Sequence, residues 1–333
     1  MNPVRWGILS TSAFAASKFI PGLRRANNID VVAVGSRTLE RAQEFAAQMN
    51  IGVAHGSYES LLADPDVDVI YNPLPNHLHV EWTKRAVDAG KHVYCEKPMA
   101  LNATELETLR PYASKRHIVE GFMVRHHPQW IEVRNRIRSG EIGELTHAHI
   151  AFAYSNTDAT NIRNIADIGG GALYDIGCYA VVAARWFFEA VPARVVAMAD
   201  RDPSFLTDRR FAALLDMGRG RSVQFSVSTQ STTHQRVHLF GTTGRIEMTI
   251  PFNQPQTEPV TYLTHNGLSS LDGLDAERHV VPANDQYALI AEWFSDLVRN
   301  EQPTSVHLDD ALVNARTLDA LFRSEISAAF ETV

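Results

Sequence analysis

Short runs rich in β-branched residues alternate with helix-like patterns over roughly the first 120 residues. The strand-like runs cover residues 4–9, 31–35, 67–71, 91–95 and 117–122, and the helix-like runs cover residues 14–25, 39–49, 78–89 and 104–114. Such alternation is typical of βαβ units, in which helices connect parallel strands. The sequence therefore predicts an α/β fold with a doubly wound parallel sheet, which binds ligands at the carboxyl ends of its strands.

The pattern changes beyond about residue 121. Strand-like segments now follow one another closely, at residues 146–154, 194–198, 210–215, 222–229, 236–240 and 245–249, and helix-like segments lie at residues 130–139, 173–187, 286–299 and 308–322. Short turns such as Gly241–Gly244 predict antiparallel hairpins. We expect a dinucleotide-binding Rossmann domain over residues 1–122. An α+β domain over residues 123–333, built on an open and largely antiparallel sheet, would bind substrate and form oligomers.

Composition narrows the class of protein. The 31 Lys and Arg against 38 Asp and Glu give a net charge of -7, which disfavours nucleic acid as a partner. Two cysteines, Cys95 and Cys178, are too few for a disulfide framework and fit a reducing, cytoplasmic location. No apolar run reaches the roughly 20 residues that span a membrane. His147 and His149 share a strand face but lack a third ligand, so we expect no metal.

The first strand-to-helix turn is where a dinucleotide's pyrophosphate binds in such folds. The turn runs Gly7-Ile-Leu-Ser-Thr-Ser-Ala-Phe-Ala15, so Ser10, Ser12 and Ala15 occupy the three places of the glycine fingerprint. Small residues still permit close approach of the backbone, and the hydroxyl groups are able to donate to phosphate. An ordinary strand-turn-helix connection has the same pattern, and this turn alone does not decide between them.

The end of the second strand carries Ser36 and Arg37, with Arg41 one turn further along the helix. An NAD enzyme usually has an acidic residue here, because a carboxylate accepts from the ribose 2'-hydroxyl. Arginine instead favours the 2'-phosphate of NADP. We therefore expect NADP, with NAD as the other possibility. The alternative is a solvated basic start of a helix.

Lys97 ends another strand and directly precedes Pro98. Proline restricts the preceding residue to an extended backbone, which fixes the direction of the lysine side chain. A lysine at the carboxyl end of a sheet strand lies where doubly wound folds bind ligands, and partial burial would lower its pKa. The alternative is a surface lysine before a turn.

Three consecutive glycines, Gly169–Gly171, precede a predicted helix that carries Asp175 and Tyr179. The spacing of four residues places both side chains on one helical face. A phenol and a carboxylate near a lysine form a plausible proton-transfer set, because a neighbouring cation lowers the pKa of a phenol. A tyrosine on an apolar helix is otherwise a core residue.

These motifs together carry a resemblance to a known family. The segments Cys95-Glu-Lys-Pro98, Pro75-Asn-His-Leu-His79 and the Gly-rich element ending at Tyr179 are similar to those of the Gfo/Idh/MocA family of oxidoreductases. The similarity covers essentially the whole chain. Within the family, the chain most resembles the branch with aldose dehydrogenases, dimeric dihydrodiol dehydrogenase and glucose-fructose oxidoreductase. This placement rests on Tyr179, because inositol-dehydrogenase-like members have histidine at that position. The glycine-poor first turn departs from the family pattern.

The resemblance implies roles for individual residues. It assigns Lys97, Tyr179 and Asp175 to catalysis, and it assigns Arg163 with Asp175 and Tyr179 to the substrate. The expected cofactor-binding residues are Ser10, Thr11, Ser12, Ala13, Phe14, Ser36, Arg37, Arg41, Pro73, Leu74, Pro75, Asn76, His79, Glu96, Lys97, Arg125 and Tyr287.

The expected activity is hydride transfer between NADP and a hydroxyl-bearing carbon of a sugar or cyclic polyol. A keto-sugar reductase and a trans-dihydrodiol dehydrogenase are alternatives within the same chemistry. A non-catalytic sensor of NAD(P) or sugar is an alternative of another class, since one fold hosts many functions. Helices or another subunit must cover the exposed face of an open sheet, so we also expect a homodimer or homotetramer.

Overall fold

The computed structural model describes residues 2–267 and 273–333 and divides them into two compact units. The first unit contains the residues up to Met123 together with Asp285–Leu312. The second contains Val124–Asn284 and Val313–Val333. The segment Asp285–Leu312, which lies far along the chain from the first predicted domain, thus packs with it.

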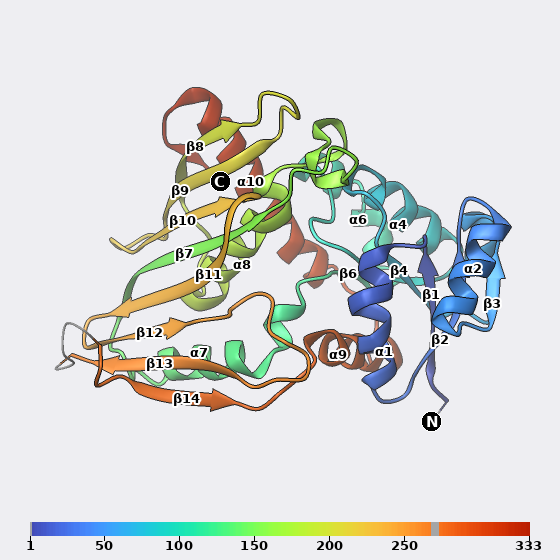
Figure 1. Cartoon of the computed structure of the whole chain (residues 1–333), viewed down its shortest axis with the longest axis horizontal. Coiled ribbons are helices and arrows are strands. Elements are labelled where there is room, and N and C mark those ends of the chain that lie inside the picture. Colours follow the sequence, from blue (N-terminus) through green and yellow to red (C-terminus); the bar gives the residue numbers. More distant parts are fainter. Residues whose placement is uncertain (1, 268–272) are drawn as a thin grey trace. The chain divides into compact units, whose positions relative to one another are not determined.

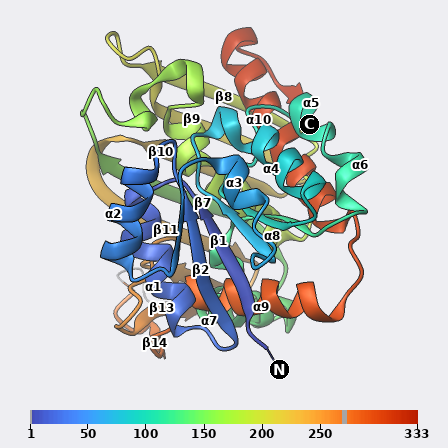
Figure 2. The ribbon, with the colours of Figure 1, turned by 90° about the vertical axis from the view of Figure 1, so that its right-hand side faces the viewer.

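The first unit is built on a six-stranded sheet (Figure 1, Figure 2). Its strands are β1 (Val4–Leu9), β2 (Ile29–Gly35), β3 (Val53–His55), β4 (Val69–Asn72), β5 (His92–Cys95) and β6 (Ile118–Glu120). All neighbours pair in parallel, in the order β3-β2-β1-β4-β5-β6. This is the Rossmann order, and its direction reverses between β1 and β4, where such sheets bind ligands. The predicted doubly wound fold is confirmed.

The first unit also contains helices, all of which connect these strands except the last, α9. They are η1 (Ala15–Phe19, a π-helix), α1 (Ile20–Arg25), α2 (Leu39–Met49), α3 (Tyr58–Leu62), η2 (Asn76–Leu78), α4 (His79–Asp88), α5 (Ala103–Glu107), α6 (Arg110–Ala113) and α9 (Gln286–Asn300). Thr38 caps the start of α2 by accepting from the Arg41 N–H, and Asn50 ends the helix in the left-handed conformation. These two local signals explain why the bounds of α2 were predictable from the sequence.

Aromatic packing brings α9 into the first unit. Trp6 of β1 is fully buried, its ring centroid lies 5.7 Å from that of Phe294, and its indole N–H donates to Ser295 Oγ at 3.2 Å. Phe19 and Tyr94 complete the cluster around Trp6. Burial of these aromatic rings stabilises the packing of α9 against the parallel sheet, although α9 follows the second sheet in the chain.

The second unit contains a nine-stranded sheet. Its strands are β7 (Leu145–Ser155), β8 (Arg194–Arg201), β9 (Asp208–Asp216), β10 (Ser222–Ser228), β11 (Gln230–Gly241), β12 (Gly244–Met248), β13 (Val260–Asn266), β14 (Glu277–Val281) and β15 (Glu331–Thr332). The order is β14-β13-β12-β11-β7-β10-β9-β8-β15. All pairs are antiparallel except β7 with β10, which confirms a largely antiparallel sheet.

The helices of the second unit pack on one face of its sheet. They are η3 (Met123–His126), α7 (Pro128–Arg138), η4 (Ile162–Asn164), η5 (Ala166–Ile168), η6 (Leu173–Gly177, a π-helix), α8 (Cys178–Phe188) and the later part of α10 (Val306–Ser327). On the other face of the sheet, Met198 is 71 % exposed. An open depression of about 740 Å³ extends there across β7 to β11. Within the described residues, no helix is both long and apolar enough to cross a membrane.

Candidate active site

The turn after β1 has the left-handed backbone conformation that glycine usually provides, although no glycine stands there. Ser10 stands in the first glycine place with a φ of 70°, and its N–H donates to the Gly35 carbonyl at 2.8 Å. This left-handed conformation costs a non-glycine residue about 1–2 kcal/mol. The predicted residues Thr11, Ser12, Ala13 and Phe14 follow, all at least partly exposed, and Ser12 Oγ accepts from the Ala15 N–H at 3.4 Å. The turn thus keeps an accessible helix start at the carboxyl end of β1.

Tyr287, in α9, packs against this turn. Its ring meets Phe14 edge-on at 5.8 Å between centroids, and burial raises the pKa of its hydroxyl. Asp285 caps α9 by accepting from the Tyr287 N–H at 3.0 Å, and Arg25 bridges to the same carboxylate at 2.6 Å. The structure therefore brings together two predicted cofactor residues that lie 273 positions apart in the sequence, in one unit.

Gly22 of α1 allows Tyr287 to approach, because a Cβ there would lie 2.6 Å from Tyr287 Cβ. We expect Gly22→Ala to displace Tyr287 and to lower the melting temperature by about 2–4 °C, since overpacking outweighs the better helix propensity of alanine. Gly52→Ala is the control, because a Cβ there meets nothing closer than 3.9 Å. Thermal unfolding followed by circular dichroism measures both. A Gly22→Ala protein that is more stable than wild type would contradict this packing.

Two arginines stand at the carboxyl end of β2 beside buried Ser36. Arg37 and Arg41 are exposed, and neither forms an ion pair with a carboxylate of the described residues. Both positive charges act on Tyr58, where they oppose the rise in pKa that burial causes. The two guanidinium groups are thus available to an anion at the place where the 2'-substituent of a dinucleotide binds in Rossmann folds.

The segment around Lys97 is held from several sides. Tyr71 donates to Glu96 Oε1 at 2.8 Å, and the Met99 N–H donates to Glu120 Oε1 at 3.0 Å. The peptide bond between Lys97 and Pro98 is cis. Lys97 is partly exposed, and the two residues that follow it, Pro98 and Met99, are buried. The side chain of Lys97 is therefore presented by a fixed backbone at the end of β5.

His79 joins the Lys97 segment to the loop after β4. Its Nδ1 lies 2.8 Å from the Pro98 carbonyl oxygen, and its Nε2 lies 2.6 Å from that of Leu74. Burial lowers the pKa of His79 to about 4, so the neutral ring donates its one N–H to one of these carbonyls. The other predicted residues of the loop, Pro73, Pro75 and Asn76, are partly exposed, whereas the side chains of Leu74 and His79 are buried. His79 thus supports the loop from within.

The second unit carries Asp175 and Tyr179 on a helix that begins with a π-helical turn. Asp175 lies in η6 and Tyr179 in the first turn of α8, where the sequence predicted one continuous α-helix. Single π-helical turns recur at functional sites. The charge of Asp175, and with smaller effects those of Tyr154 and Tyr179, raises the pKa of Arg163.

Two side chains donate to the same oxygen of the Asp175 carboxylate. Tyr154 donates its hydroxyl to Asp175 Oδ2 at 2.5 Å, and Arg163 Nε lies 3.0 Å from the same oxygen. Tyr154 was not predicted from the sequence. Its only signal is its position at the end of a strand-like run, and nothing in the chain marks Asp175 as its partner.

Tyr179 lies against an apolar wall. It is 5 % exposed, and its ring centroid lies 6.0 Å from that of Phe152 and 5.6 Å from that of Phe252. Arg125, in η3, is partly exposed and belongs to the same unit. The structure thus gathers Asp175, Tyr179 and Arg163 in the second unit, whereas Lys97 and Tyr287 belong to the first.

Comparison with known proteins gives consistent results. The family model described as an oxidoreductase family with an NAD-binding Rossmann fold matches residues 4–126, and the GFO/IDH/MocA C-terminal domain matches residues 130–247. An uncharacterized oxidoreductase of Rhizobium meliloti is 44 % identical over the full length of both chains. A D-xylose 1-dehydrogenase (NADP(+)) of Haloferax volcanii is 34 % identical, over 98 % of this chain and 99 % of the relative.

Solved structures agree with the sequence relatives. A 3-ketoreductase from Actinomadura kijaniata, solved in complex with NADP and TDP-benzene, has a TM-score of 0.89 and 31 % identity to this chain. The match covers 97 % of this chain and 98 % of the reductase. The similarity therefore extends over both units.

Proposed function

The chain belongs to the Gfo/Idh/MocA family of oxidoreductases, and from this premise we propose that it is an NADP-dependent dehydrogenase of sugars or cyclic polyols. The observation that carries the proposal is the cluster in the second unit, where Arg163 Nε lies 3.0 Å from Asp175 Oδ2 and the charges of Asp175 and Tyr179 both raise the pKa of Arg163. A cation beside a phenol and a carboxylate supplies the groups that proton transfer to and from a hydroxyl requires. We also propose that residues 1–122 supply most of the dinucleotide site and that residues 123–333 supply most of the substrate site.

The residues of the first unit fit a dinucleotide. The glycine-like backbone of Ser10 keeps the start of the first helix accessible to a pyrophosphate. Arg37 and Arg41 have the charge and exposure to hold a 2'-phosphate, and the absence of an acidic residue in the Ser36-Arg37 pair favours NADP over NAD. When bound, NADP accepts or delivers the hydride.

The chain's own residues then handle the proton and the charge. In the oxidation direction, Tyr179 takes the proton of the substrate hydroxyl, and Lys97 stabilises the negative charge that develops on the oxygen. Asp175 accepts from a substrate hydroxyl, and Tyr154 with Arg163 fixes the direction of its carboxylate. Arg125 and Tyr287 contribute to the nicotinamide end of the cofactor site.

A reductase of nucleotide-linked keto-sugars is the second candidate, and the full-length match to a 3-ketoreductase favours it. A trans-dihydrodiol dehydrogenase uses the same chemistry on another ring. A panel of aldoses, cyclic polyols and diols with NADP⁺, and of keto-sugars with NADPH, separates these by the change in absorbance of NADPH. Turnover of keto-sugars alone would select the reductase. Binding of cofactor without turnover of any compound would select the sensor.

We propose that the open face of the nine-stranded sheet forms a homodimer or homotetramer. The depression on this face is lined by Ala151, Val196, Met198, Ala212 and Leu214, among other residues. An exposed sheet face with apolar side chains is stabilised when a second copy covers it.

Light scattering at micromolar concentration should give two or four times the monomer mass. The double variant Met198→Glu/Leu214→Glu should give the monomer mass, because two carboxylates per chain would be buried at the interface. Val280→Glu is the control, because Val280 is 61 % exposed on β14, outside the depression. A monomeric wild type would exclude this interface.

A further inference from the structure

We infer that Asp208 is a positioning residue of the proposed reaction, because its carboxyl group fixes the start of the turn that carries Asp175 and leads to Tyr179. The inference rests on the proposed function of those two residues. Asp208 opens strand β9 and is 1 % exposed, and one oxygen, Oδ2, accepts from the Leu173 N–H at 2.6 Å. Leu173 is the first residue of η6.

The same carboxyl group explains why residue 171 is a glycine. A Cβ at Gly171 would overlap Asp208 Oδ1, and the φ of 120° there is one that side chains rarely allow. Gly170 is equally constrained, because its Cβ would lie 2.6 Å from the carbonyl oxygens of Arg163 and Ile165. The Gly-rich stretch thus makes room for the Asp208 carboxyl and for the carbonyl of Arg163.

Backbone hydrogen bonds tie this turn to the substrate residues. The Gly171 N–H donates to the Arg163 carbonyl at 2.9 Å, and the Asp175 N–H donates to the Gly171 carbonyl at 3.1 Å. Arg163 therefore contacts the turn through its backbone and contacts Asp175 through its guanidinium. A shift at Leu173 would move Asp175, and Tyr179 two residues beyond the end of η6, relative to Tyr154 on β7.

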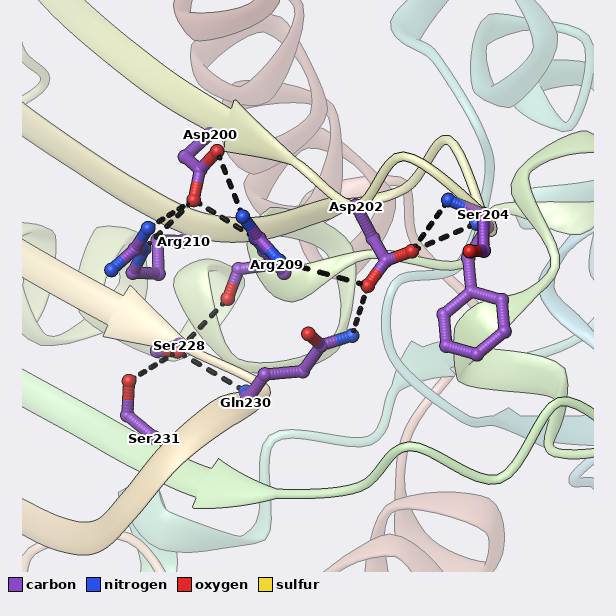
Figure 3. A network of polar contacts seen from close by, with 9 residues as sticks. Asp200, Asp202, Ser204, Arg209, Arg210, Ser228, Gln230 and Ser231 are labelled. Atoms are coloured by element: carbon purple, nitrogen blue, oxygen red, sulfur yellow. Dashed lines mark hydrogen bonds and ion pairs between the residues drawn. The ribbon is translucent and has the colours of Figure 1, made fainter.

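The position of Asp208 is itself fixed by the loop before it. Asp202 accepts from the backbone N–H groups of Ser204 and Phe205, at 2.8 and 3.0 Å, and from the Gln230 side chain at 3.0 Å. Figure 3 shows Asp202 between Ser204 and Gln230. The Asp202 N–H closes the loop by donating to the Thr207 carbonyl at 2.9 Å. Asp208, which follows Thr207 and begins β9, is therefore held in place by a hydrogen-bonded loop.

Asp208 is buried without an ion pair among the described residues. The charge of Arg201 acts on Asp208, but Arg201 pairs with Glu325 at 2.6 Å. Burial raises the pKa of Asp208 to about 7, so its protonated form is well populated near neutral pH. Asparagine matches that form in size and charge and keeps an oxygen for the Leu173 N–H. Alanine keeps neither, and serine is too short to reach that N–H.

The test uses four variants of the full chain. Asp208→Ala and Asp208→Ser should lower kcat at least about tenfold, because small misplacements of reacting groups carry large costs, while the Kd for NADP stays within about twofold. Asp208→Asn should restore most of the turnover. Asp216→Asn is the matched control, since Asp216 ends the same strand and caps the Gly218 N–H at 2.9 Å. A merely structural role would lower stability without separating kcat from NADP binding.

Hydrogen exchange provides a readout that needs no substrate. Peptides covering residues 172–180 should exchange about tenfold faster in Asp208→Ala or Asp208→Ser than in wild type, and at the wild-type rate in Asp216→Asn. Unchanged exchange in both variants, or an Asp208→Asn protein as impaired as Asp208→Ala, would overturn the inference. A wild type that turns over no compound would instead refute the proposed function, and exchange would still decide whether Asp208 holds the turn.

Discussion

Replacing Tyr179 by phenylalanine should lower turnover by about 100-fold to 10,000-fold, the usual contribution of a positioned acid-base group. The substitution removes only the hydroxyl, so the apolar contacts of the ring with Phe152 and Phe252 remain. We therefore expect an unchanged fold and little change in the Kd for NADP. Initial rates on the best substrate, with NADP at saturation, measure the effect.

Tyr174→Phe is the matched control, because Tyr174 lies in η6, the π-helical turn directly before α8, and its ring packs on Phe322 at 4.9 Å. It should retain most of the activity. Lys97→Met should be at least as damaging as Tyr179→Phe, since it removes the charge that stabilises the developing alkoxide. Near wild-type turnover in both Tyr179→Phe and Lys97→Met would refute the catalytic assignment.

Replacing Arg37 and Arg41 together by alanine should lower the preference for NADP over NAD by about 100-fold or more, because each guanidinium loses a charge-assisted hydrogen bond to the 2'-phosphate. Salt weakens contacts between exposed groups, so the comparison must be made at one ionic strength. The measured quantity is the ratio of kcat/KM for NADP to that for NAD, in wild type and in the double variant.

The control removes two other exposed arginines of the first unit. Arg85 and Arg110 pair with carboxylates, so Arg85→Ala/Arg110→Ala changes the net charge equally without touching the proposed cofactor site. Its ratio should match that of wild type. A wild type that prefers NAD, or an equal fall in both double variants, would leave no specific role for Arg37 and Arg41.

Local chemistry made part of the fold predictable from the sequence. β1 and α2 have the predicted bounds, because a β-branched apolar run and a Thr38 cap act within a few residues. β3, β13, β14 and β15 were missed. β3 has three residues and β15 has two, and none of the four stands at the centre of its sheet. The parallel pair of β7 and β10 depends on a connection of more than 60 residues, which no local pattern encodes.

The candidate site was only partly predictable for the same reason. Asp175 and Tyr179 stand in a short motif that singles them out as candidates, but the donors that hold Asp175 come from elsewhere in the chain. Tyr154 lies 21 residues away, and Asp208 reaches the turn from β9. Hydrogen bonds between distant segments follow from tertiary packing, which sequence periodicity does not report.

The central claim is hydride transfer between a sugar-type carbon and NADP. The direct measurement uses the best substrate from the panel, deuterated at the carbon that is oxidised, and determines the mass of the NADPH formed. We predict one deuterium in each NADPH for wild type and almost no product for Tyr179→Phe. NADP binding without any formation of NADPH from the whole panel, and without any oxidation of NADPH by keto-sugars, would contradict the account.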